Sequence, residues 1–424
     1  MRYARVGLST VIAIVLWGGL VFAALDQGWG HRSIATTDDT VGFELAARSI
    51  AEQRNTGNLS FILIEDGRRV ADFHLSKDKP VDGQTVFQVA SLGKWITAWG
   101  VMALVEDGII DLDAPASTYL TRWQLPESEW DASGVTVRRL LSHTAGLTDG
   151  LGYDGFDTAD DRQTLEASLT KAADASPGKD GKAALGEEPG SAWNYSGASY
   201  TLLQLIIEEV SGTSFPAFMQ NRVFAPLEMD RTTFDHSAAL ELGLAQNFRP
   251  DGSEEPFRWY TALGATSLFT TSEDLAKFIS SQRPEFANPV LDPDTLALIR
   301  TPHASELGAD VWGLGAMLYA PNNSGGFIIG HDGSNEPAIN TAARLNPATG
   351  DGIVILSTGD PMIATQLAGE WVFWKTGNVD TLTFASRLPT ALAVFAGGLL
   401  LILAGAVLTI LLRGRAPSRQ MKGA

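Results

Sequence analysis

The stretch Phe87–Asp113, FQVASLGKWITAWGVMALVEDGIIDLD, sets Ser91 and Lys94 three residues apart at the start of a long apolar segment. Its apolar positions predict a helix that begins near Ser91 and ends near Asp107-Gly108. Residues at this spacing share one helix face, so the two side chains should meet. Burying an ammonium is costly without a partner or a task. Lys94 is therefore either a charge that reaches water from a helix end or the activator of Ser91.

The Ser-x-x-Lys pattern by itself is weak, because it occurs four times in the chain. The other three pairs lie in polar, turn-rich stretches where a lysine is simply solvated: Ser76-Lys79, Ser168-Lys171 and Ser176-Lys179. Only Ser91 opens a long apolar helix, where backbone N–H groups and the helix dipole favour negative charge. A desolvated lysine beside such a serine can act as its base. On spacing and context alone, the catalytic role and the capped helix remain equally open.

Composition excludes several kinds of site. The chain has 424 residues, enough for one large domain or two ordinary ones, and no cysteine. A disulfide scaffold, a thiolate metal site and a cysteine nucleophile are therefore excluded. No histidine pair has the spacing of metal ligands, and no glycine-rich phosphate loop or Gly-x-Ser-x-Gly elbow is present. We therefore expect no metal and no cofactor.

Two uncharged apolar runs, Val6–Leu25 and Leu388–Leu412, are long enough to span a bilayer. Residues 1–25 are expected to be a signal peptide or a membrane anchor, because Val21-Phe22-Ala23 is a tolerable cleavage site. Residues 388–412 are predicted to form a transmembrane helix, followed by a basic cytoplasmic tail at 413–424.

Basic residues flank both runs on their outer sides, namely Arg2 and Arg5 before the first, and Arg413, Arg415, Arg419 and Lys422 after the second. Both tails should then be cytoplasmic, if the first span is retained, with the chain between them periplasmic or at the cell surface. That central part holds 25 of the 31 Lys and Arg residues and all 49 Asp and Glu residues. Its negative charge would repel nucleic acid, so we expect no nucleic-acid partner.

Between the spans, periodicity predicts an α+β domain at 34–380. Strands are expected as a pair over 59–75 and as three runs at 326–333, 339–347 and 352–359. Helices are expected at 40–54, 198–212, 272–282 and 361–377. This order predicts an antiparallel sheet flanked by helices, with a mostly helical subdomain beside it. Residues 154–190 are polar and are expected to form an exposed insertion or a mobile flap.

Two later segments resemble motifs of a known protein family. WNYSGASYTLLQLIIEEVSG (193–212) places Tyr195 on a tight turn before a helix, and IIGHDGSNEPAINTA places His331 on a strand before Gly333 and Ser334. With LLSHTAGL (140–147) and SLFTTSEDLAKF (267–278), this order resembles the serine β-lactamase and penicillin-binding-protein superfamily. The likeness is to the class C β-lactamase-like, D-Ala-D-Ala carboxypeptidase and esterase branch, over about residues 40–375, and it implies a β-lactamase/transpeptidase-like fold.

The resemblance implies roles for four side chains. Ser91 would be the acylated nucleophile and Lys94 its proton acceptor. Tyr195 would pass the proton to the leaving group and later activate water. His331 stands where many relatives have lysine; it would orient the substrate or assist the tyrosine, and it would titrate near neutral pH.

The resemblance also assigns backbone roles. The N–H groups of Ser91 and Ser334 would form the oxyanion hole, and Gly333 would let an extended substrate lie against its strand. Gly197 stands where many relatives have a substrate-contacting asparagine, which shifts the expectation from β-lactam hydrolysis toward peptidase or esterase activity.

Two other segments resemble motifs of this family, and one histidine lies near a motif, but none of the three is expected to be catalytic. Lys375-Thr376-Gly377 resembles the third motif, but its position at a helix end makes it an ordinary stop signal. Tyr153-Asp154-Gly155 resembles the tyrosine motif, but a polar loop follows it. His143, within 140–147, is expected to be a buried structural histidine.

These patterns together predict a membrane-anchored extracytoplasmic serine hydrolase that works through an acyl-enzyme. Its substrate would be a small molecule or peptide with an amide or ester bond. The alternative is a penicillin-sensor or binding protein on the same fold, which acylates without turnover.

Overall fold

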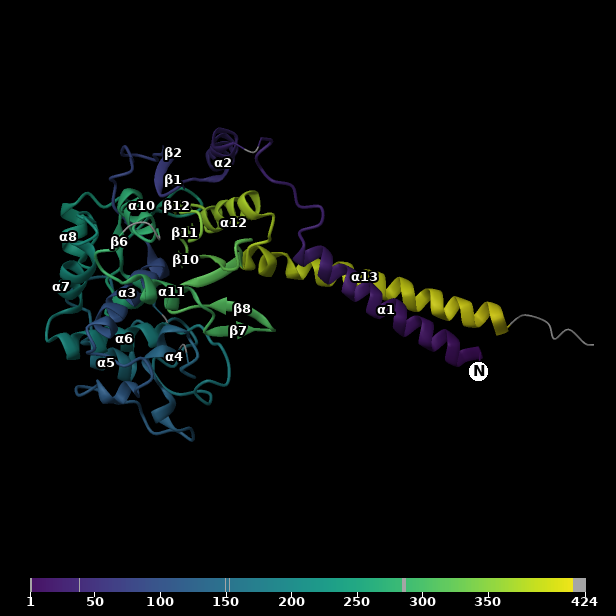
Figure 1. Ribbon diagram of the computed structural model, residues 1–424, viewed down its shortest axis with the longest axis horizontal. Coiled ribbons are helices and arrows are strands. Elements are labelled where there is room, and N and C mark those ends of the chain that lie inside the picture. Colours follow the sequence, from purple (N-terminus) through teal and green to yellow (C-terminus); the bar gives the residue numbers. More distant parts are fainter. Residues whose placement is uncertain (1, 38, 149, 152, 284–286, 415–424) are drawn as a thin grey trace, which may run out of the picture. The chain divides into compact units, whose positions relative to one another are not determined.

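The computed structural model describes residues 2–37, 39–148, 150–151, 153–283 and 287–414 (Figure 1). The predicted basic residues Arg415, Arg419 and Lys422 lie outside this range. Contacts divide the chain into two units, one of Ile34–Thr376 and one of Met1–Ser33 with Gly377–Ala424.

An antiparallel sheet of eight strands is the base of the larger unit, with the strand order β2-β1-β12-β11-β10-β9-β8-β7. The strands are β1 (Leu59–Glu65), β2 (Arg68–Leu75), β7 (Ala304–Glu306), β8 (Ala309–Trp312), β9 (Met317–Pro321), β10 (Phe327–Asn335), β11 (Ile339–Asn346) and β12 (Asp351–Thr358). The early strand pair and the three late strands lie here as expected from their apolar runs. The short strands β7, β8 and β9 were not predicted.

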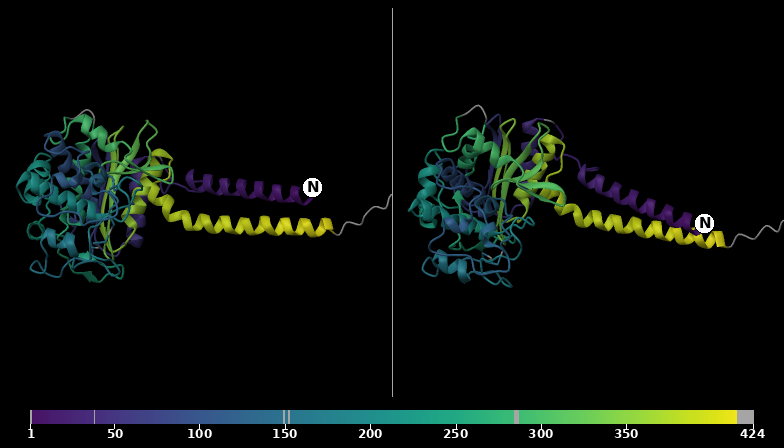
Figure 2. Two further views of the ribbon diagram at one scale, coloured as in Figure 1. Left: turned by 90° about the horizontal axis from the view of Figure 1, so that it is seen from below. Right: turned by 60° about the horizontal axis from the view of Figure 1, so that its bottom comes forward.

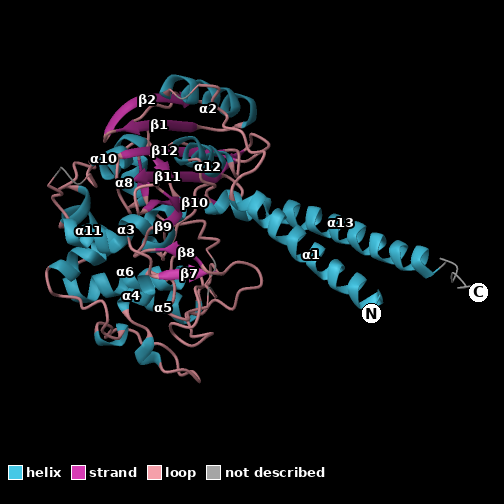
Figure 3. Ribbon diagram, turned by 45° about the vertical axis from the view of Figure 1, so that its right-hand side comes forward, coloured by secondary structure: helices cyan, strands magenta, loops and turns pink. Residues whose placement is uncertain are grey.

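Helices cover both faces of the sheet, as Figure 3 shows. On one face, α2 (Thr40–Arg54) packs on β2, and α12 (Ile363–Thr376) packs on β11 and β12. On the other, α10 (Ser272–Ser280) packs on β1 and β12. Strands covered on both sides need apolar residues at successive positions, which explains the run LSFILIE in β1.

The remaining helices form a helical block beside the sheet, with α3 (Gly93–Glu106) at its centre. The residues of α3 from Gly93 to Leu104 are all buried, as expected of a helix that is apolar on every side. Around it lie α4 (Val137–Leu141), α5 (Leu165–Lys171), α6 (Gly197–Ser211), α7 (Phe215–Met219), α8 (His236–Glu241), α9 (Leu263–Thr266) and α11 (Pro293–Arg300). The unit is therefore α+β, as predicted.

Short elements complete the larger unit. Two small antiparallel pairs join β3 (Phe87–Gln88) to β6 (Phe269–Thr270) and β4 (Asn247–Phe248) to β5 (Glu254–Glu255). Single helical turns are η1 (Ala90–Leu92), η2 (Ala116–Thr118), η3 (Ala132–Gly134) and η4 (Gln220–Phe224).

The prediction of an exposed insertion at 154–190 is wrong in part. This segment contains α5, and its residues Leu165, Leu169 and Ala183 are buried in the main core. The few apolar residues of this segment are widely spaced, so its mostly polar composition gave no indication that they are buried.

The smaller unit contains α1 (Arg2–Asp26) and α13 (Thr381–Gly414), which are long and apolar enough to cross a membrane (Figure 2). They lie side by side and antiparallel: the Trp17 Nε1–H donates to the Phe395 carbonyl at 3.1 Å, and Phe22 lies edge-on to Phe384. Gly398 makes room for the indole, because a Cβ there would lie 2.1 Å from Trp17 Nε1.

Candidate active site

Ser91 lies in the turn η1, between the short strand β3 and the helix α3. The predicted helix therefore begins slightly later than expected, at Gly93. The preceding residue, Ala90, has a φ of +49°, a left-handed conformation that is costly for a residue with a side chain. Such a conformation persists only where the surroundings hold it, and here the Val89 N–H donates to the Leu268 carbonyl at 3.0 Å.

Lys94 is buried and directed at Ser91. Its side chain is 2% exposed, and its Nζ lies 3.0 Å from Ser91 Oγ and 2.6 Å from the carbonyl oxygen of Ala265. Within the described residues, no carboxylate pairs with it. The geometry therefore excludes the interpretation that Lys94 reaches water from the helix end. Its amine is instead held against the Ser91 hydroxyl.

Tyr195 lies next to this pair, on the turn before α6. The Lys94 Nζ is 5.0 Å from the centre of the Tyr195 ring. His143 holds the turn in two ways, because its Nδ1 accepts the Ser196 N–H at 3.1 Å and its carbonyl accepts the Asn194 N–H at 2.8 Å. Its ring also lies 4.4 Å from that of Tyr195. His143 is therefore buried, as expected, and it positions the tyrosine segment.

Trp312, at the end of β8, packs the aromatic groups of the site together. Its ring lies 4.7 Å from His143, 5.6 Å from Tyr195 and 5.4 Å from His331. Its Nε1–H donates to the Leu141 carbonyl at 3.2 Å. Sequence reasoning missed this residue, because a four-residue strand with two exposed positions and one partly buried position gives no periodic signal.

His331 lies on β10 and is 1% exposed. Its Nδ1 is 2.5 Å from the carbonyl oxygen of Asp332, which can only accept, so Nδ1 carries the proton. Its Nε2, left with a lone pair, has no hydrogen-bond partner among the described residues. Burial, with a smaller contribution from the charge of Lys94, lowers the pKa of His331 to about 3.

The expectation that His331 titrates near neutral pH is therefore wrong, because a buried imidazole cannot readily take a charge. The same burial and the same lysine hold the pKa of His143 well below its ordinary value. Both histidines are neutral imidazoles at physiological pH.

Gly333 lies at the closest approach between β10 and the Ser91 turn. A Cβ at this position would lie 2.0 Å from the Val89 carbonyl oxygen, 2.4 Å from Thr341 Oγ1 and 3.1 Å from the Leu92 nitrogen. The glycine therefore lets β10 lie directly against the Ser91 turn, and the pairing of an extended substrate with this strand stays a prediction. The next residue, Ser334, is exposed.

Gly197, the first residue of α6, lies against Tyr153. A Cβ at Gly197 would lie 2.0 Å from Tyr153 Oη and 2.3 Å from its Cε2. The phenol therefore occupies the space in which many relatives would carry an asparagine side chain. In the sequence, Tyr153 belongs to a segment that only resembles the tyrosine motif. In the structure, its ring packs against Gly197 at the site.

The opposite face of β10 carries a buried ion pair between Asp332 and Arg344. The Asp332 carboxylate also accepts from Tyr319 Oη at 2.8 Å and from Thr365 Oγ1, in α12, at 2.6 Å. These contacts fix the strand that carries His331 against β11 and α12, and no sequence pattern indicated them.

Lys375 lies away from these groups. It ends α12, and its Nζ is 2.9 Å from Glu65 Oε1 and 3.2 Å from Asp351 Oδ2. The structure thus brings Ser91, Lys94, Tyr195 and His331 together and places Lys375 in a separate ion-pair cluster. No group of three His, Asp or Glu side chains in the described chain is arranged to hold a metal ion.

Known proteins share this arrangement of sequence and fold. The match to penicillin-binding protein 4* of Bacillus subtilis is 32% identical over 163 residues and covers 37% of this chain and 32% of that protein. Esterase EstB of Burkholderia gladioli is 26% identical over 282 residues, which cover 56% of this chain and 68% of the esterase. The matches to the first two curated relatives span only about a third to a half of those proteins.

Among solved structures, the D-amino acid amidase from Ochrobactrum anthropi in complex with D-phenylalanine has the same fold. The TM-score is 0.61 at 21% identity, over 79% of this chain and 98% of the amidase. Residues 43–371 match the Beta-lactamase protein family. The chain therefore belongs to the β-lactamase family and has the fold of serine β-lactamases and penicillin-binding proteins.

Proposed function

We propose that this protein is a serine hydrolase that forms an acyl-enzyme on Ser91 from an ester or amide substrate. The observation that carries the proposal is the buried Lys94 Nζ, 3.0 Å from Ser91 Oγ. In the unprotonated state, this amine takes the hydroxyl proton while Oγ attacks the substrate carbonyl. The backbone N–H groups of Ser91 and Ser334 then stabilise the oxyanion.

Tyr195 carries the proton onward to the leaving group. Its ring lies beside Lys94 and is held by His143 and Trp312, so its hydroxyl has a fixed position. In the second half of the reaction, Tyr195 accepts a proton from the water that hydrolyses the acyl-enzyme. A fixed general base of this kind contributes typically 10²–10⁴-fold to a rate.

The neutral state of His331 narrows the substrate class. A neutral imidazole offers no positive charge to a substrate carboxylate, and its Nε2 is a buried acceptor. The substrate region of β10 therefore suits an uncharged ester or amide group better than a free carboxylate. The likeness to an esterase and to an amidase supports this choice.

The same proposal includes anchoring of the catalytic unit to a membrane. Both α1 and α13 have the length and composition of a membrane span, and their antiparallel contacts bring their outer ends to one side. With basic residues at both outer ends, that side is cytoplasmic and the larger unit is extracytoplasmic. Protease added to intact spheroplasts should then release a fragment of roughly residues 26–387. Cleavage of a C-terminal tag from outside would contradict the topology.

Steady-state kinetics of the full chain in detergent tests the hydrolase. Wild type should release many equivalents of p-nitrophenol from p-nitrophenyl butyrate, and Ser91→Ala should release none above background. A burst of one equivalent that then stops would instead identify a protein that acylates without turnover. Equal release by wild type and Ser91→Ala would reject both.

A further inference from the structure

The part of β10 that carries the site has strand neighbours on one side. β9 pairs with β10 over Phe327–Gly330, whereas β11 pairs with it as far as Asn335. Beyond the range of β9, the other edge of β10 approaches the Ser91 turn, where Gly333 makes its close contacts. Because β11 alone, among the described strands, pairs with this stretch, its position depends on the side chains that hold it.

Asp332 anchors this stretch through its carboxylate, on the face of the sheet opposite to His331. The carboxylate pairs with Arg344 of β11. It also accepts from Tyr319 Oη of β9 at 2.8 Å and from Thr365 Oγ1 of α12 at 2.6 Å. Arg344 is completely buried, and its guanidinium lies 3.4 Å from the centre of the Tyr319 ring. Groups from β9, β11 and α12 thus converge on one carboxylate and fix its position.

Stability alone does not explain a buried ion pair at this place. Both charges lose their hydration on burial, and apolar residues of similar volume often give equal or greater stability. The pair lies instead next to a peptide group that the site uses, because the carbonyl oxygen of Asp332 accepts from His331 Nδ1–H at 2.5 Å. This peptide group ends at Gly333, whose backbone rotates more freely than that of other residues, so its orientation needs a further hold.

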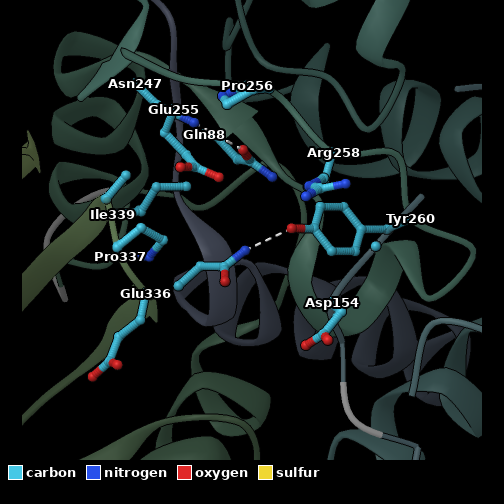
Figure 4. A pocket seen from close by; sticks show the side chains of 13 residues that line it. Gln88, Asp154, Asn247, Glu255, Pro256, Arg258, Tyr260, Glu336, Pro337 and Ile339 are labelled. Atoms are coloured by element: carbon cyan, nitrogen blue, oxygen red, sulfur yellow. Dashed lines mark hydrogen bonds between the residues drawn. The ribbon is translucent and has the colours of Figure 1, made fainter. Parts of the chain in front are cut away.

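The far end of the same stretch has its own anchor, at a pocket of about 370 Å³ (Figure 4). Asn335, the last residue of β10, donates from its Nδ2 to Tyr260 Oη at 2.6 Å, a bond that the dashed line at the Tyr260 hydroxyl marks. Ser334, just before it, is exposed. Asp332 is therefore the anchor on the His331 side of the stretch, and Asn335 is the anchor at its end.

We propose that Asp332 is a positioning residue that keeps the His331 imidazole in its Nδ1–H form. Its carboxylate holds the strand, the strand holds its carbonyl, and that carbonyl selects the tautomer by accepting the proton on Nδ1. The ring centre of Tyr195 lies 6.3 Å from that of His331, so a change of tautomer would alter the field around the proposed proton carrier. The effect on the rate rests on the proposed acylation of Ser91, whereas the effect on the imidazole does not.

Two substitutions that keep the side-chain shape loosen this anchor. Tyr319→Phe and Thr365→Val each remove one hydroxyl that donates to Asp332, and both leave the imidazole itself unchanged. Thr232→Val is the matched control, because it removes a hydroxyl that donates at 2.9 Å to the buried carboxylate of Asp274, in α10. Each variant is measured as the full chain in detergent, with p-nitrophenyl butyrate as the substrate.

Steady-state kinetics gives the first readout. The double variant Tyr319→Phe/Thr365→Val should lower kcat by about 10-fold, less than the loss of about 10²-fold that a displacement of about 1 Å brings. KM should stay within about twofold of wild type, because the anchor does not bind the substrate. Thr365→Val alone should show a smaller loss of kcat, and Thr232→Val should keep the wild-type kcat.

Nuclear magnetic resonance of the chain labelled with ¹⁵N-histidine gives the second readout, on the imidazole itself. The His331 signals are those that disappear in His331→Asn, and the shifts of the two ring nitrogens distinguish the tautomers. Wild type and Thr232→Val should show the Nδ1–H form. The double variant should show a share of the Nε2–H form, a change that a merely structural anchor would not produce.

Three results would overturn the proposal: an Nε2–H imidazole in wild type, wild-type ring-nitrogen shifts in the double variant, or a wild-type kcat in the double variant. Absence of turnover in wild type would instead reject the proposed hydrolase, and the ring-nitrogen shifts would still decide whether Asp332 holds the tautomer of His331.

Discussion

Substitution of Gly333 by alanine adds one methyl group at the closest approach between β10 and the Ser91 turn. The new Cβ would lie 2.0 Å from the Val89 carbonyl oxygen and 3.1 Å from the Leu92 nitrogen, both backbone atoms that flank Ser91. Neither can rotate away as a side chain would, so the turn itself must move. Overpacking of this kind costs typically 1–3 kcal/mol of stability. A displacement of about 1 Å at the reacting groups lowers a rate by about 10²-fold.

Two measurements on purified Gly333→Ala separate these effects. Urea unfolding should show a free energy of unfolding lower by about 1–3 kcal/mol, and kcat for p-nitrophenyl butyrate should fall by about 10²-fold in the protein that remains folded. Gly326→Ala, just before β10, is the control, because its Cβ would meet nothing closer than 3.4 Å. Wild-type kcat and stability in Gly333→Ala would refute the claim that this glycine positions the nucleophile turn.

Three further perturbations have defined outcomes. Lys94→Ala should lower kcat by about 10²–10⁴-fold, while Lys375→Ala should stay within twofold of wild type. A large loss of kcat in Lys375→Ala together with a small loss in Lys94→Ala would mean that Lys375 activates Ser91. The pKa of His331 is about 3 in the folded protein, against its ordinary value of 6.5. The contribution of this neutral imidazole to the free energy of unfolding is therefore fully present above pH 6.5 and is lost as the pH falls. Between pH 6.5 and 4.5, wild type should lose up to about 2.7 kcal/mol more than His331→Asn in urea unfolding; equal losses would contradict a buried neutral imidazole. Gly197→Asn should cost about 1–3 kcal/mol, and Tyr153→Ala should recover much of it, whereas additive costs would mean that the two do not share this space.

Local geometry explains which parts of the site were predictable from the sequence. Ser91 and Lys94 lie within one helical turn, so their contact follows from spacing once the segment is helical. Tyr195 and His331 were found through the order of family motifs. Each lies on a turn or strand whose boundaries were visible in the pattern of glycine and apolar residues.

Other features depend on contacts between distant segments. Trp312 meets His143 and Tyr195 across more than a hundred residues of sequence, and it lies on a strand too short to show alternation. The neutral state of His331 follows from complete burial, which an isolated histidine in a sequence does not reveal. The space filled by Tyr153 next to Gly197 is likewise set by tertiary packing alone.

Covalent labelling followed by peptide mass mapping tests the central claim, that Ser91 is the nucleophile activated by Lys94. A fluorophosphonate should modify wild type at one site, on the peptide that contains Ser91. Lys94→Ala should react far more slowly, and Ser91→Ala should not react, although both keep the wild-type circular dichroism spectrum. Undiminished labelling of Ser91→Ala, or an adduct on another residue, would contradict the account.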